Sequence, residues 1–412
     1  MKEANKLNRK VSKTNLQRTS KMYSKERGIT LIALVITIII LIILATVSIN
    51  VVLGEGGLIQ RAQQAKELTE QAALEEQQGL NSLMSEFTNI MAEDQNPPEE
   101  KSEVEEAKES GTPFGDTTTI TDDLDNPIKV PGGFNIAEDS GTKVEEGIVI
   151  EDSNNNQFVW IPVGEYNVSK TINSTGKLTN ELSRREWADE NVVAEPTLVN
   201  GDDVIGSSFY GEGNENSVAK DQIDAFKTSS TTNKGFYIGR YEAGTEAERT
   251  SETAPLTTPL VQANKYPYVY VSRNDAKQQA EAMYSGNEFI TSQLISSYAW
   301  DTALNFICQT NEEGYLLATT KDSTYGNIGT GSSGKTQTGE YEADNYSNIH
   351  DLLGNCWEWT TEYSSNNNGP CVSRGGNYGY SSSYAAVRNN FNTSLAFFNY
   401  SFRLQLYVNP ES

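Results

Sequence analysis

Apolar residues form one long run near the start of the chain and many short runs after it. From Ile29 to Ile49 there are 21 consecutive residues without a charge, "ITLIALVITIIILIILATVSI". At about 1.5 Å rise per residue, a helix of this length covers a hydrocarbon core of about 30 Å. The pattern therefore predicts one membrane-spanning helix over residues 29–49.

A basic segment precedes this run. Residues 1–27 contain nine Lys or Arg and two Glu. Positive charge is retained on the cytoplasmic side of a membrane helix, so we expect the part of the chain after Asn50 to lie outside the cell. This orientation predicts a cell-surface protein.

The helical pattern continues beyond the apolar run and then ends in an acidic segment. Small or apolar residues recur at near-helical spacing at Leu58, Ala62, Ala65, Leu68 and Ala72, which predicts an extended helix over 29–92. The following stretch, "AEDQNPPEEKSEVEEAKESGTPFGD", has paired prolines, many carboxylates and few large apolar residues. Such a composition is typical of a solvated linker, so residues 93–125 are predicted to be a disordered spacer.

Short apolar runs separated by Gly, Asn and Ser begin near Asn126 and continue to the end. Runs such as "GIVIED", "FVWIPVGEY" and "GFYIGRYEAG" indicate short strands joined by turns. Helices are expected in "SRNDAKQQAEAMYS", with Ser272 or Asn274 as N-cap, and in "TSQLISSYAWDTALNFICQT", with Leu294 and Tyr298 near one face. Residues 126–412 are therefore predicted to form an α+β domain with much irregular loop.

Charge and composition restrict the possible partners and chemistry. The formal net charge of -24 argues against nucleic acid as a partner, because binding to phosphates needs a basic surface. The three cysteines, Cys308, Cys356 and Cys371, are too few for a disulfide framework, although a bridge between Cys356 and Cys371 is possible. The chain contains a single histidine, His350, which is expected to be a structural or surface residue.

The junction "KERGITLIALVITIII" resembles the prepilin leader of type IV pilins and pseudopilins. This resemblance implies that residues 1–28 are a leader, that a prepilin peptidase cleaves between Gly28 and Ile29, that Ile29 becomes N-methylated, and that other pilins are possible partners. The family's Glu at the fifth mature position is Ala33 here, which argues against pilus packing of the usual kind. A plain membrane anchor is the alternative, whereas an ordinary cleaved signal has a shorter apolar stretch.

Several phrases in the C-terminal domain resemble the formylglycine-generating enzyme (sulfatase-modifying factor) family. They are "GFYIGRYEAG", "YAWDTALNF", "HDLLGNCWEWTTEY", "SRGGNY" and "SFRLQLYV", in the family's order between about Pro131 and Val408. The resemblance implies a C-type-lectin-like fold. It does not carry over the copper site, because the positions of the family's two catalytic cysteines are occupied by Tyr380 and Ala385. With one histidine, the chain also cannot supply the ligands of the iron-dependent relatives, so neither copper nor iron is expected.

A calcium site is compatible with the same resemblance. In the family, a structural calcium is bound by the loop around "GNCWEW", which implies side-chain ligands from Asp351 and Glu358 and carbonyl ligands from Gly354 and Cys356. The alternative is that Glu358 forms an ion pair with an arginine such as Arg374 or Arg403. Both readings are left open by the sequence.

The stretch "RGGNYGYSSSYAAVRNNFNTSLAFFNYSF", residues 374–402, has the composition of a recognition surface. Tyr and Phe supply contact area with few rotatable bonds, while Ser and Asn adapt their hydrogen bonding. Small and apolar residues of the stretch are expected to form its framework, and at least one of the adjacent Phe397 and Phe398 should be exposed. The candidate ligand-binding residues are Tyr378, Tyr380, Ser381, Ser382, Ser383, Tyr384, Asn389, Asn390, Phe397, Phe398, Asn399 and Tyr400.

This stretch also resembles the variable proteins of diversity-generating retroelements, which implies a hypervariable ligand surface on the same lectin-like fold. The leading interpretation is a surface-displayed, pilin-like adhesin or receptor-binding protein without catalytic residues, whose ligand is a protein or a glycan. One alternative is an oxidoreductase of the formylglycine-generating type. Another is a minor pseudopilin of a secretion system.

Overall fold

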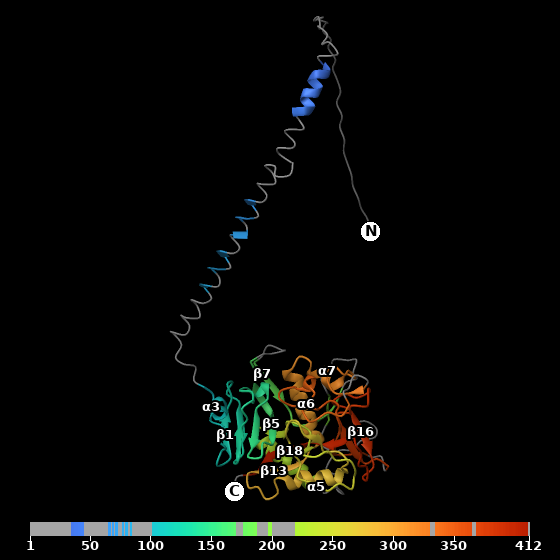
Figure 1. Cartoon of the computed structure of the whole chain (residues 1–412). Helices are drawn as coiled ribbons and strands as arrows, with labels where there is room; N and C mark the ends of the chain where they lie inside the picture. Colours follow the sequence, from blue (N-terminus) through green and yellow to red (C-terminus); the bar gives the residue numbers. More distant parts are fainter. Residues whose placement is uncertain are drawn as a thin grey trace, which may run out of the picture. The chain divides into compact units, whose positions relative to one another are not determined.

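The structure is a computed structural model of the whole chain (Figure 1). It describes residues 34–44, short helical pieces between residues 65 and 84, and residues 101–410 apart from gaps at 170–175, 188–196, 200–218, 330–333 and 365–367. The chain divides into two compact units, Met1–Glu99 and Glu100–Ser412. Each unit is considered by itself.

In the first unit, residues 34–44 form a helix whose apolar side chains are exposed. Among the residues that the structure describes, no helix has the length and apolar character needed to cross a membrane. The predicted cleavage pair, Gly28 and Ile29, lies outside the described residues, as do both ends of the predicted membrane segment 29–49. The membrane-spanning helix and the pilin-like leader therefore remain predictions.

A six-stranded antiparallel sheet forms one layer of the second unit (Figure 1). Its strand order is β13-β18-β10-β5-β4-β3. The strands are β3 (Phe134–Ile136), β4 (Val149–Asp152), β5 (Gln157–Pro162), β10 (Gly235–Gly239), β13 (Ile290–Leu294) and β18 (Leu404–Val408). The centre of this sheet is apolar on both faces, and Phe158, Trp160 and Tyr237 are fully buried there. Continuous apolar strands of this kind are typical of a sheet that is covered on both sides.

A four-stranded sheet forms a second layer and carries the candidate ligand-binding stretch. Its order is β16-β15-β14-β17, with β14 and β17 parallel and the other pairs antiparallel. The strands are β14 (Trp357–Tyr363), β15 (Cys371–Arg374), β16 (Arg388–Phe391) and β17 (Tyr400–Phe402). The helix α6 (Ser297–Thr310) contacts both β5 and β14, and its side chains from Ser297 to Ile307 are all buried. It therefore joins the two sheets through the core.

The remaining strands form two-stranded pairs. They are β1 (Thr118–Thr121), β2 (Pro127–Val130), β6 (Gly164–Asn167), β7 (Lys177–Asn180), β8 (Arg184–Glu186), β9 (Thr197–Val199), β11 (Gly244–Thr245) and β12 (Tyr266–Pro267). The other helices are α3 (Glu103–Ser110), α4 (Ala219–Thr232), α5 (Arg273–Met283) and α7 (Gly314–Thr319), with short 3-10 turns at Val144–Glu146 and Glu342–Asp344. The α+β class expected from the sequence is confirmed.

The expected helices are present, with one boundary corrected. Ser272 caps α5 by accepting a hydrogen bond from the backbone N–H of Asp275, as expected. The second helix begins later than expected, because Ser296 caps α6 through the N–H of Ala299 and the preceding residues 290–294 pair with β18. Leu294 therefore belongs to a strand and not to the helix.

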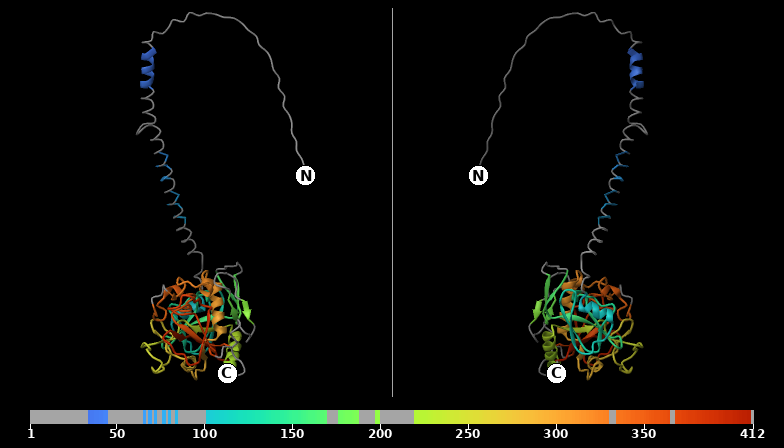
Figure 2. Two further views of the ribbon diagram at one scale, coloured as in Figure 1. Left: turned by 90° about the vertical axis from the view of Figure 1, so that its right-hand side faces the viewer. Right: turned by 90° about the vertical axis from the view of Figure 1, so that its left-hand side faces the viewer.

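The helix α4 was not expected from the sequence, and neither was the short helix α7. The second half of α4, "KTSSTT", is rich in Ser and Thr, which are weak helix formers, so propensity gives little signal. Its first half supplies Ile223 and Phe226, both buried, and α4 packs beside β10 and the C-terminal strand β18 (Figure 2). Tertiary packing therefore stabilises this helix.

The predicted disordered linker over 93–125 is wrong for its second part. The acidic stretch forms α3, which Ser102 caps and Gly111 ends with a left-handed conformation. Val104 on α3 and Ile120 on β1 are buried in the domain core. The folded domain therefore begins near Glu100 and not at Asn126, because Val104 and the partly buried Ala107 pack this acidic helix against the core.

Candidate functional site: an aromatic surface on a buried ionic base

The two loops that carry most of the candidate ligand-binding residues meet at one tryptophan, Trp357. The ring of Tyr380, from the loop between β15 and β16, lies 6.5 Å from the ring of Trp357. The ring of Tyr400, at the end of the loop between β16 and β17, lies 6.3 Å from it in a stacked arrangement. Tyr400 also stacks on Trp359 at 4.8 Å. The rings thus form a continuous series of contacts from the exposed Tyr380, which is tilted against Trp357, through Tyr400 into the core.

Backbone hydrogen bonds fix the edges of the same two loops. The N–H of Trp357 donates to the carbonyl of Asn399 (2.9 Å), and the N–H of Tyr378 donates to the carbonyl of Asn355 (3.0 Å). A third bond joins the N–H of Tyr270 to the carbonyl of Phe397 (2.9 Å). The loops therefore lie on one framework although their side chains differ in exposure.

The candidate residues divide into three groups by exposure. Tyr380, Phe397 and Phe398 are the large exposed ones, with 56%, 53% and 48% of their surface accessible, and the expectation that at least one of the two Phe is exposed is confirmed. Ser381 and Ser382 are also exposed, while Tyr378, Tyr384, Asn389, Asn390 and Asn399 are partly buried.

Two candidate residues, Ser383 and Tyr400, are buried and cannot contact a ligand directly. Ser383 packs against Gly376 so closely that a Cβ on the glycine would lie 2.1 Å from the Cβ of Ser383. Tyr400 is enclosed by Trp357, Trp359 and the edge of Phe391. Both residues belong to the framework, and their assignment to the ligand surface is corrected. We call the exposed residues Tyr380, Ser381, Ser382, Phe397 and Phe398 the aromatic surface.

Two framework residues, Trp357 and Tyr270, were missing from the candidates. Trp357 lies in the phrase "GNCWEW", which the sequence analysis used only for a metal site. Tyr270 has a left-handed backbone, with φ of 54°, and its N–H bonds to the loop that carries Phe397. A left-handed conformation in an aromatic residue is uncommon, and nothing in the local sequence "YPYVYVS" signals it.

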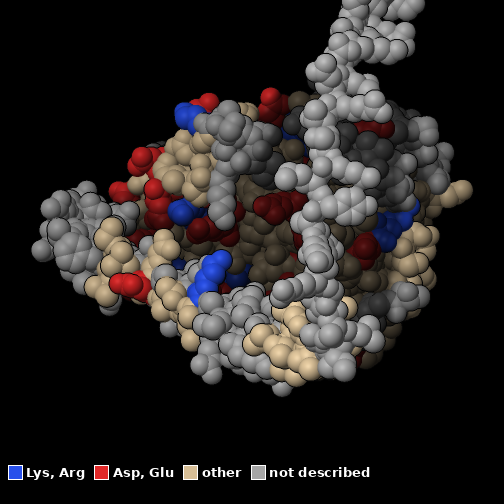
Figure 3. Space-filling model, turned by 90° about the horizontal axis from the view of Figure 1, so that it is seen from above, with Lys and Arg blue, Asp and Glu red and all other residues tan. Residues whose placement is uncertain are grey.

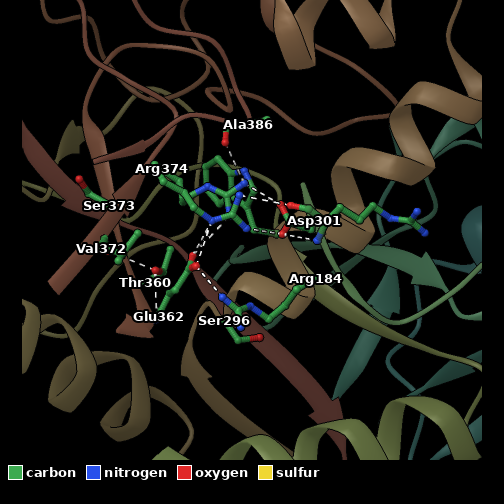
Figure 4. Close-up of polar contacts among 12 residues, drawn as sticks. Arg184, Ser296, Asp301, Thr360, Glu362, Val372, Ser373, Arg374 and Ala386 are labelled. Carbon is green, nitrogen blue, oxygen red and sulfur yellow. Dashed lines mark hydrogen bonds and ion pairs between the residues drawn. The ribbon is translucent and has the colours of Figure 1, made fainter. Parts of the chain in front are cut away.

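A buried ionic cluster lies at the base of the first loop (Figure 4). Arg374 ends β15 and Arg388 begins β16, and the two residues are register partners. The Arg374 Nη2 lies 2.6 Å from Asp301 Oδ1, and the Arg388 Nη2 lies 2.6 Å from Asp301 Oδ2. Arg374 also donates to the carbonyls of Val387 and Ala386 (3.1 and 3.2 Å). Both ends of the loop 375–387 are thereby bound to one carboxylate on α6.

A second carboxylate, Glu362, completes the cluster. Its Oε1 accepts hydrogen bonds from Arg184 Nη2 (2.8 Å) and Arg388 Nε (3.0 Å). All these side chains are buried. Burial alone would raise the pKa of Asp301, but Arg374 and Arg388 lower it to about 2. The carboxylate is therefore ionised at neutral pH and binds both arginines as charged groups.

The residues of the expected calcium loop are buried, and Glu358 forms an ion pair. Its Oε1 lies 2.7 Å from Arg403 Nη2, and its Oε2 accepts from Arg403 Nε at 2.9 Å. Arg403 also donates to the carbonyls of Gly239 and His350. The ion-pair alternative that the sequence left open is thus present, with Arg403 as the partner. Asp351 has a left-handed backbone, and its Oδ2 accepts a hydrogen bond from the N–H of Gly339 (2.8 Å).

Acidic residues dominate the charged surface of the domain. On the face drawn in Figure 3, Asp and Glu side chains are spread among uncharged residues, and the Lys and Arg side chains are scattered. This agrees with the net charge of -24. It offers no basic surface on that face for a polyanion.

Comparison with known proteins identifies the domain. A model of the family described as the sulfatase-modifying factor enzyme 1-like domain matches residues 151–405. The chain belongs to this family. The match confirms, over residues 151–405, the resemblance found between about Pro131 and Val408 and, with it, the C-type-lectin-like fold. No curated protein matches the chain.

Three solved structures show remote similarity to this member of the sulfatase-modifying factor family. The variable protein 1 of Treponema denticola is 12% identical with a TM-score of 0.35, over 61% of this chain and 95% of its own. PvdO from Pseudomonas aeruginosa is 15% identical with a TM-score of 0.35, over 63% and 97%. The third structure, titled CarF, is 15% identical with a TM-score of 0.31, over 43% and 87%.

Tyr380 and Ala385, which the family resemblance places at the positions of the catalytic cysteines of copper-dependent members, carry no thiol. Tyr380 is exposed on the aromatic surface, and Ala385 is buried with its carbonyl accepting from the indole N–H of Trp300 (3.0 Å). His350 is buried and stacked on Tyr241, and burial and the charge of Arg240 lower its pKa to about 3. The single histidine is therefore a neutral structural residue, as expected.

All three cysteines are free. The bridge between Cys356 and Cys371 that the sequence left possible does not form. Burial raises the pKa of both thiols. Among the residues that the structure describes, no group of three or more His, Cys, Asp or Glu side chains has the arrangement of a metal site.

Proposed function

We propose that this protein is a binding protein of the cell surface, which presents the aromatic surface on a sulfatase-modifying-factor-like domain that carries out no catalysis. The observation that supports it best is the contrast between the exposed Tyr380, Phe397 and Phe398 and the buried framework below them. The ionic cluster holds the base of the first loop, and backbone bonds to Trp357 and Tyr270 hold the second. Exposed aromatic groups at a rigid site are typical of binding hot spots.

The chemistry of the surface favours contact over catalysis. Its exposed residues are Tyr, Ser and Phe, which offer neither a metal ligand of the soft or imidazole type nor a general base near neutral pH. The two cysteine positions of the copper-dependent relatives hold Tyr380 and Ala385. A protein or glycan ligand is bound in this proposal through apolar area and hydroxyl hydrogen bonds.

The fixed ends of the loop 375–387 support a further part of the proposal, a variable ligand surface. Arg374 and Arg388 bind Asp301, and the backbone N–H groups of Ala385 and Ala386 bind the carbonyls of Leu317 and Ala318 (both 3.1 Å). The exposed residues between these anchor points, Tyr380, Ser381 and Ser382, can change without loss of the contacts that fix the loop. The composition of the stretch, similar to that of retroelement variable proteins, fits such a role.

The N-terminal sequence is the basis for display outside the cell. The basic segment 1–27 and the uncharged run 29–49 favour a membrane-anchored or pilin-like segment, cleaved between Gly28 and Ile29 by a prepilin peptidase. Mass spectrometry of the chain after co-expression with such a peptidase tests this part. A product that begins at Ile29 supports it, and an uncut chain contradicts it.

The binding proposal is tested with the full-length protein and paired variants. The wild-type chain is applied to an array of glycans and to a library of displayed extracellular protein domains. Tyr380→Ala with Phe398→Ala removes two exposed rings of the aromatic surface, whereas Leu198→Ala removes an exposed apolar side chain on β9 as the control. We expect a ligand whose affinity falls more than about tenfold in the double variant and is unchanged in the control.

Two results would contradict the proposal. One is a ligand that binds the double variant as tightly as the wild type. The other is copper-dependent oxidation of a cysteine-containing peptide by the purified chain, which would support the oxidoreductase alternative. Near-UV circular dichroism confirms that each variant is folded.

A further inference from the structure

A third loop, residues 246–257, is bound to the loop that carries the exposed phenylalanines. The side chain of Arg249 at its centre is buried. Its guanidinium group donates hydrogen bonds to three backbone carbonyls, those of Val269 (2.9 Å), Pro255 (2.5 Å) and Tyr270 (3.2 Å). The N–H of Tyr270 in turn donates to the carbonyl of Phe397 (2.9 Å). One arginine and one tyrosine therefore connect the third loop to the loop between β16 and β17.

A second connection joins the third loop to the loop 375–387. The Oε1 of Glu248 lies 3.2 Å from the Nζ of Lys335. Burial, followed by the thiol of Cys356, raises the pKa of Tyr378, and the positive charge of Lys335 opposes this shift. Lys335 therefore lies close enough to act electrostatically on Tyr378 while it binds Glu248, so the third loop is connected to both loops of the aromatic surface.

The end of the third loop is fixed to the framework of the same surface. The hydroxyl of Tyr268 accepts a hydrogen bond from the N–H of Thr257 (2.8 Å) and donates one to its carbonyl (2.9 Å). The ring of Tyr268 lies 5.3 Å from the ring of Phe402 on β17 and 5.0 Å from the guanidinium group of Arg249. These contacts hold the third loop on the strand that follows Phe397 and Phe398.

The third loop adds an apolar side chain to the surface. Leu256 follows the bound Pro255 and is 40% exposed. Among the residues that the structure describes in the second unit, six large apolar or aromatic side chains are exposed. Four of these six lie on the three connected loops, namely Leu256, Tyr380, Phe397 and Phe398. Exposed apolar area that gathers on fixed loops is typical of a contact surface for another macromolecule.

The third loop also carries negative charge, which the other two loops lack. Its exposed carboxylates, which we call the acidic edge, are those of Glu246, Glu248 and Glu252. Two of them form ion pairs, but the lysines are the more covered partners: Lys335 is 16% exposed where Glu248 is 49% exposed. The stretch 374–402 contains no carboxylate. A neutral aromatic area therefore adjoins an acidic edge.

The amides of the two aromatic loops are used within the loops themselves. Asn377 Oδ1 accepts from the N–H of Gly379 (2.8 Å), and Asn392 Oδ1 accepts from the N–H of Ser394 (3.1 Å). Asn390 Nδ2 donates to a backbone carbonyl before β15 (3.1 Å). A glycan is covered with hydroxyl groups that need hydrogen-bond partners when they lose water. Leucine and phenylalanine side chains cannot supply such partners, so the surface favours an apolar contact.

We propose that the partner of this surface is a folded protein with an apolar patch beside basic residues, and that Leu256 and the acidic edge contact it together with the aromatic surface. This inference rests on the proposed binding function and narrows its ligand from protein or glycan to protein. An apolar centre with a charged rim is the usual anatomy of a protein interface. The acidic edge would attract the basic partner and speed association, while the apolar side chains would slow dissociation.

The test uses the full-length chain and the folded protein domains that it selects from the displayed library. Leu256→Ala removes the apolar side chain of the third loop, with Leu198→Ala as the matched control. Glu252→Lys reverses a charge of the acidic edge, and Glu138→Lys reverses an exposed charge after β3 as its control. Surface plasmon resonance measures both rate constants at about 50 and about 300 mM sodium chloride, because salt screens exposed charges. Near-UV circular dichroism confirms that each variant is folded.

We expect Leu256→Ala to weaken binding more than about fivefold, chiefly through faster dissociation. Glu252→Lys should slow association more than about threefold at low salt and have little effect at high salt. Both control variants should bind as the wild type does.

Two results would overturn this inference while the proposed binding function stands. One is a protein domain whose binding is weakened by Tyr380→Ala with Phe398→Ala but unchanged by Leu256→Ala and by Glu252→Lys. The other is a ligand on the glycan array that the double variant no longer binds, with no binding protein domain in the library. A selected domain that binds the double variant as tightly as the wild type would instead contradict the proposed function itself.

Discussion

Arg374 and Arg388 face each other across the β15–β16 ladder and bind the two oxygens of one carboxylate, that of Asp301. Like charges this close repel each other unless an anion lies between them. The anion here comes from α6, the helix that joins the two sheets. The base of the loop 375–387 is therefore fixed to the centre of the fold, while the middle of the loop, around Tyr380, is exposed.

Asp301→Asn should destabilise the protein strongly. The substitution keeps the shape of the side chain but leaves Arg374 and Arg388 buried with Glu362 as the remaining carboxylate of the cluster. Breaking a buried ion pair by removing one partner costs about 3–5 kcal/mol. The free energy of unfolding in urea measures the loss. Asp224→Asn, which removes an exposed ion pair with Lys220, should change it by less than about 1 kcal/mol. Equal effects of the two substitutions would contradict this account of the cluster.

The effect of Asp301→Asn should depend on pH. The pKa of Asp301 is lowered to about 2 in the folded state, below that of the unfolded chain at about 3.9. A carboxylate of this kind contributes stability that is fully present above the unfolded pKa and is lost as pH falls through the folded pKa. The difference in unfolding free energy between wild type and variant should therefore be constant above about pH 4 and decrease toward pH 2. Urea unfolding at several pH values measures it, and a difference that grows on acidification would exclude this mechanism.

The sequence was sufficient to predict the class of the fold and the exposure of at least one ring of the pair Phe397 and Phe398. Short apolar runs marked β4, β5 and β10 of the six-stranded sheet, and Ser272 marked the start of α5. The pair Phe397 and Phe398 could be expected to expose at least one ring because adjacent residues of an extended segment point in opposite directions. These signals are local, and local signals survive folding when tertiary contacts agree with them.

The features that the sequence could not provide depend on contacts between distant residues. Nothing near Tyr400 distinguishes it from Tyr380, yet Trp357 and Trp359 enclose the first and leave the second exposed. Similarly, the composition of α3 is that of a linker, and only the pocket that receives Val104 shows that it is folded. The composition of a segment indicates how polar it is on average. Whether the segment folds against the domain is decided by the burial of single residues such as Val104.

Aromatic residues of the two loops should differ sharply in their contribution to stability. Tyr380→Ala and Phe398→Ala remove exposed rings, and each should change the unfolding free energy by less than about 1 kcal/mol. Tyr400→Ala empties a buried position between Trp357 and Trp359 and should cost about 3–5 kcal/mol. Chemical denaturation of the three variants measures these values. Similar losses in all three would mean that the rings of the aromatic surface are part of the core.

The cysteines should play no structural role through a disulfide. Cys356 and Cys371 are buried and free, and burial raises the pKa of both thiols. Iodoacetamide at mildly alkaline pH should therefore leave both residues unlabelled in the native protein and label both after unfolding in urea, as read by peptide mass spectrometry. A reducing agent should not change the unfolding midpoint. A lower midpoint under reduction would show that a bridge had formed.

Two glycines with the same backbone requirement should respond differently to alanine. Gly354 and Gly286 have φ of 96° and 78°, a region that alanine adopts at a cost of about 1 kcal/mol. At Gly286 a Cβ would meet nothing within 4 Å, whereas at Gly354 it would lie 2.2 Å from the carbonyl oxygen of Asn327. That oxygen belongs to the backbone and cannot move away without disturbing the bridge between Asn327 and Gly354. Gly354→Ala should therefore cost more than about 3 kcal/mol, and Gly286→Ala about 1 kcal/mol. Urea unfolding of both variants measures the two losses in unfolding free energy and separates the steric clash at Gly354 from the cost of the backbone conformation. Equal losses would show that the loop before Trp357 shifts without penalty.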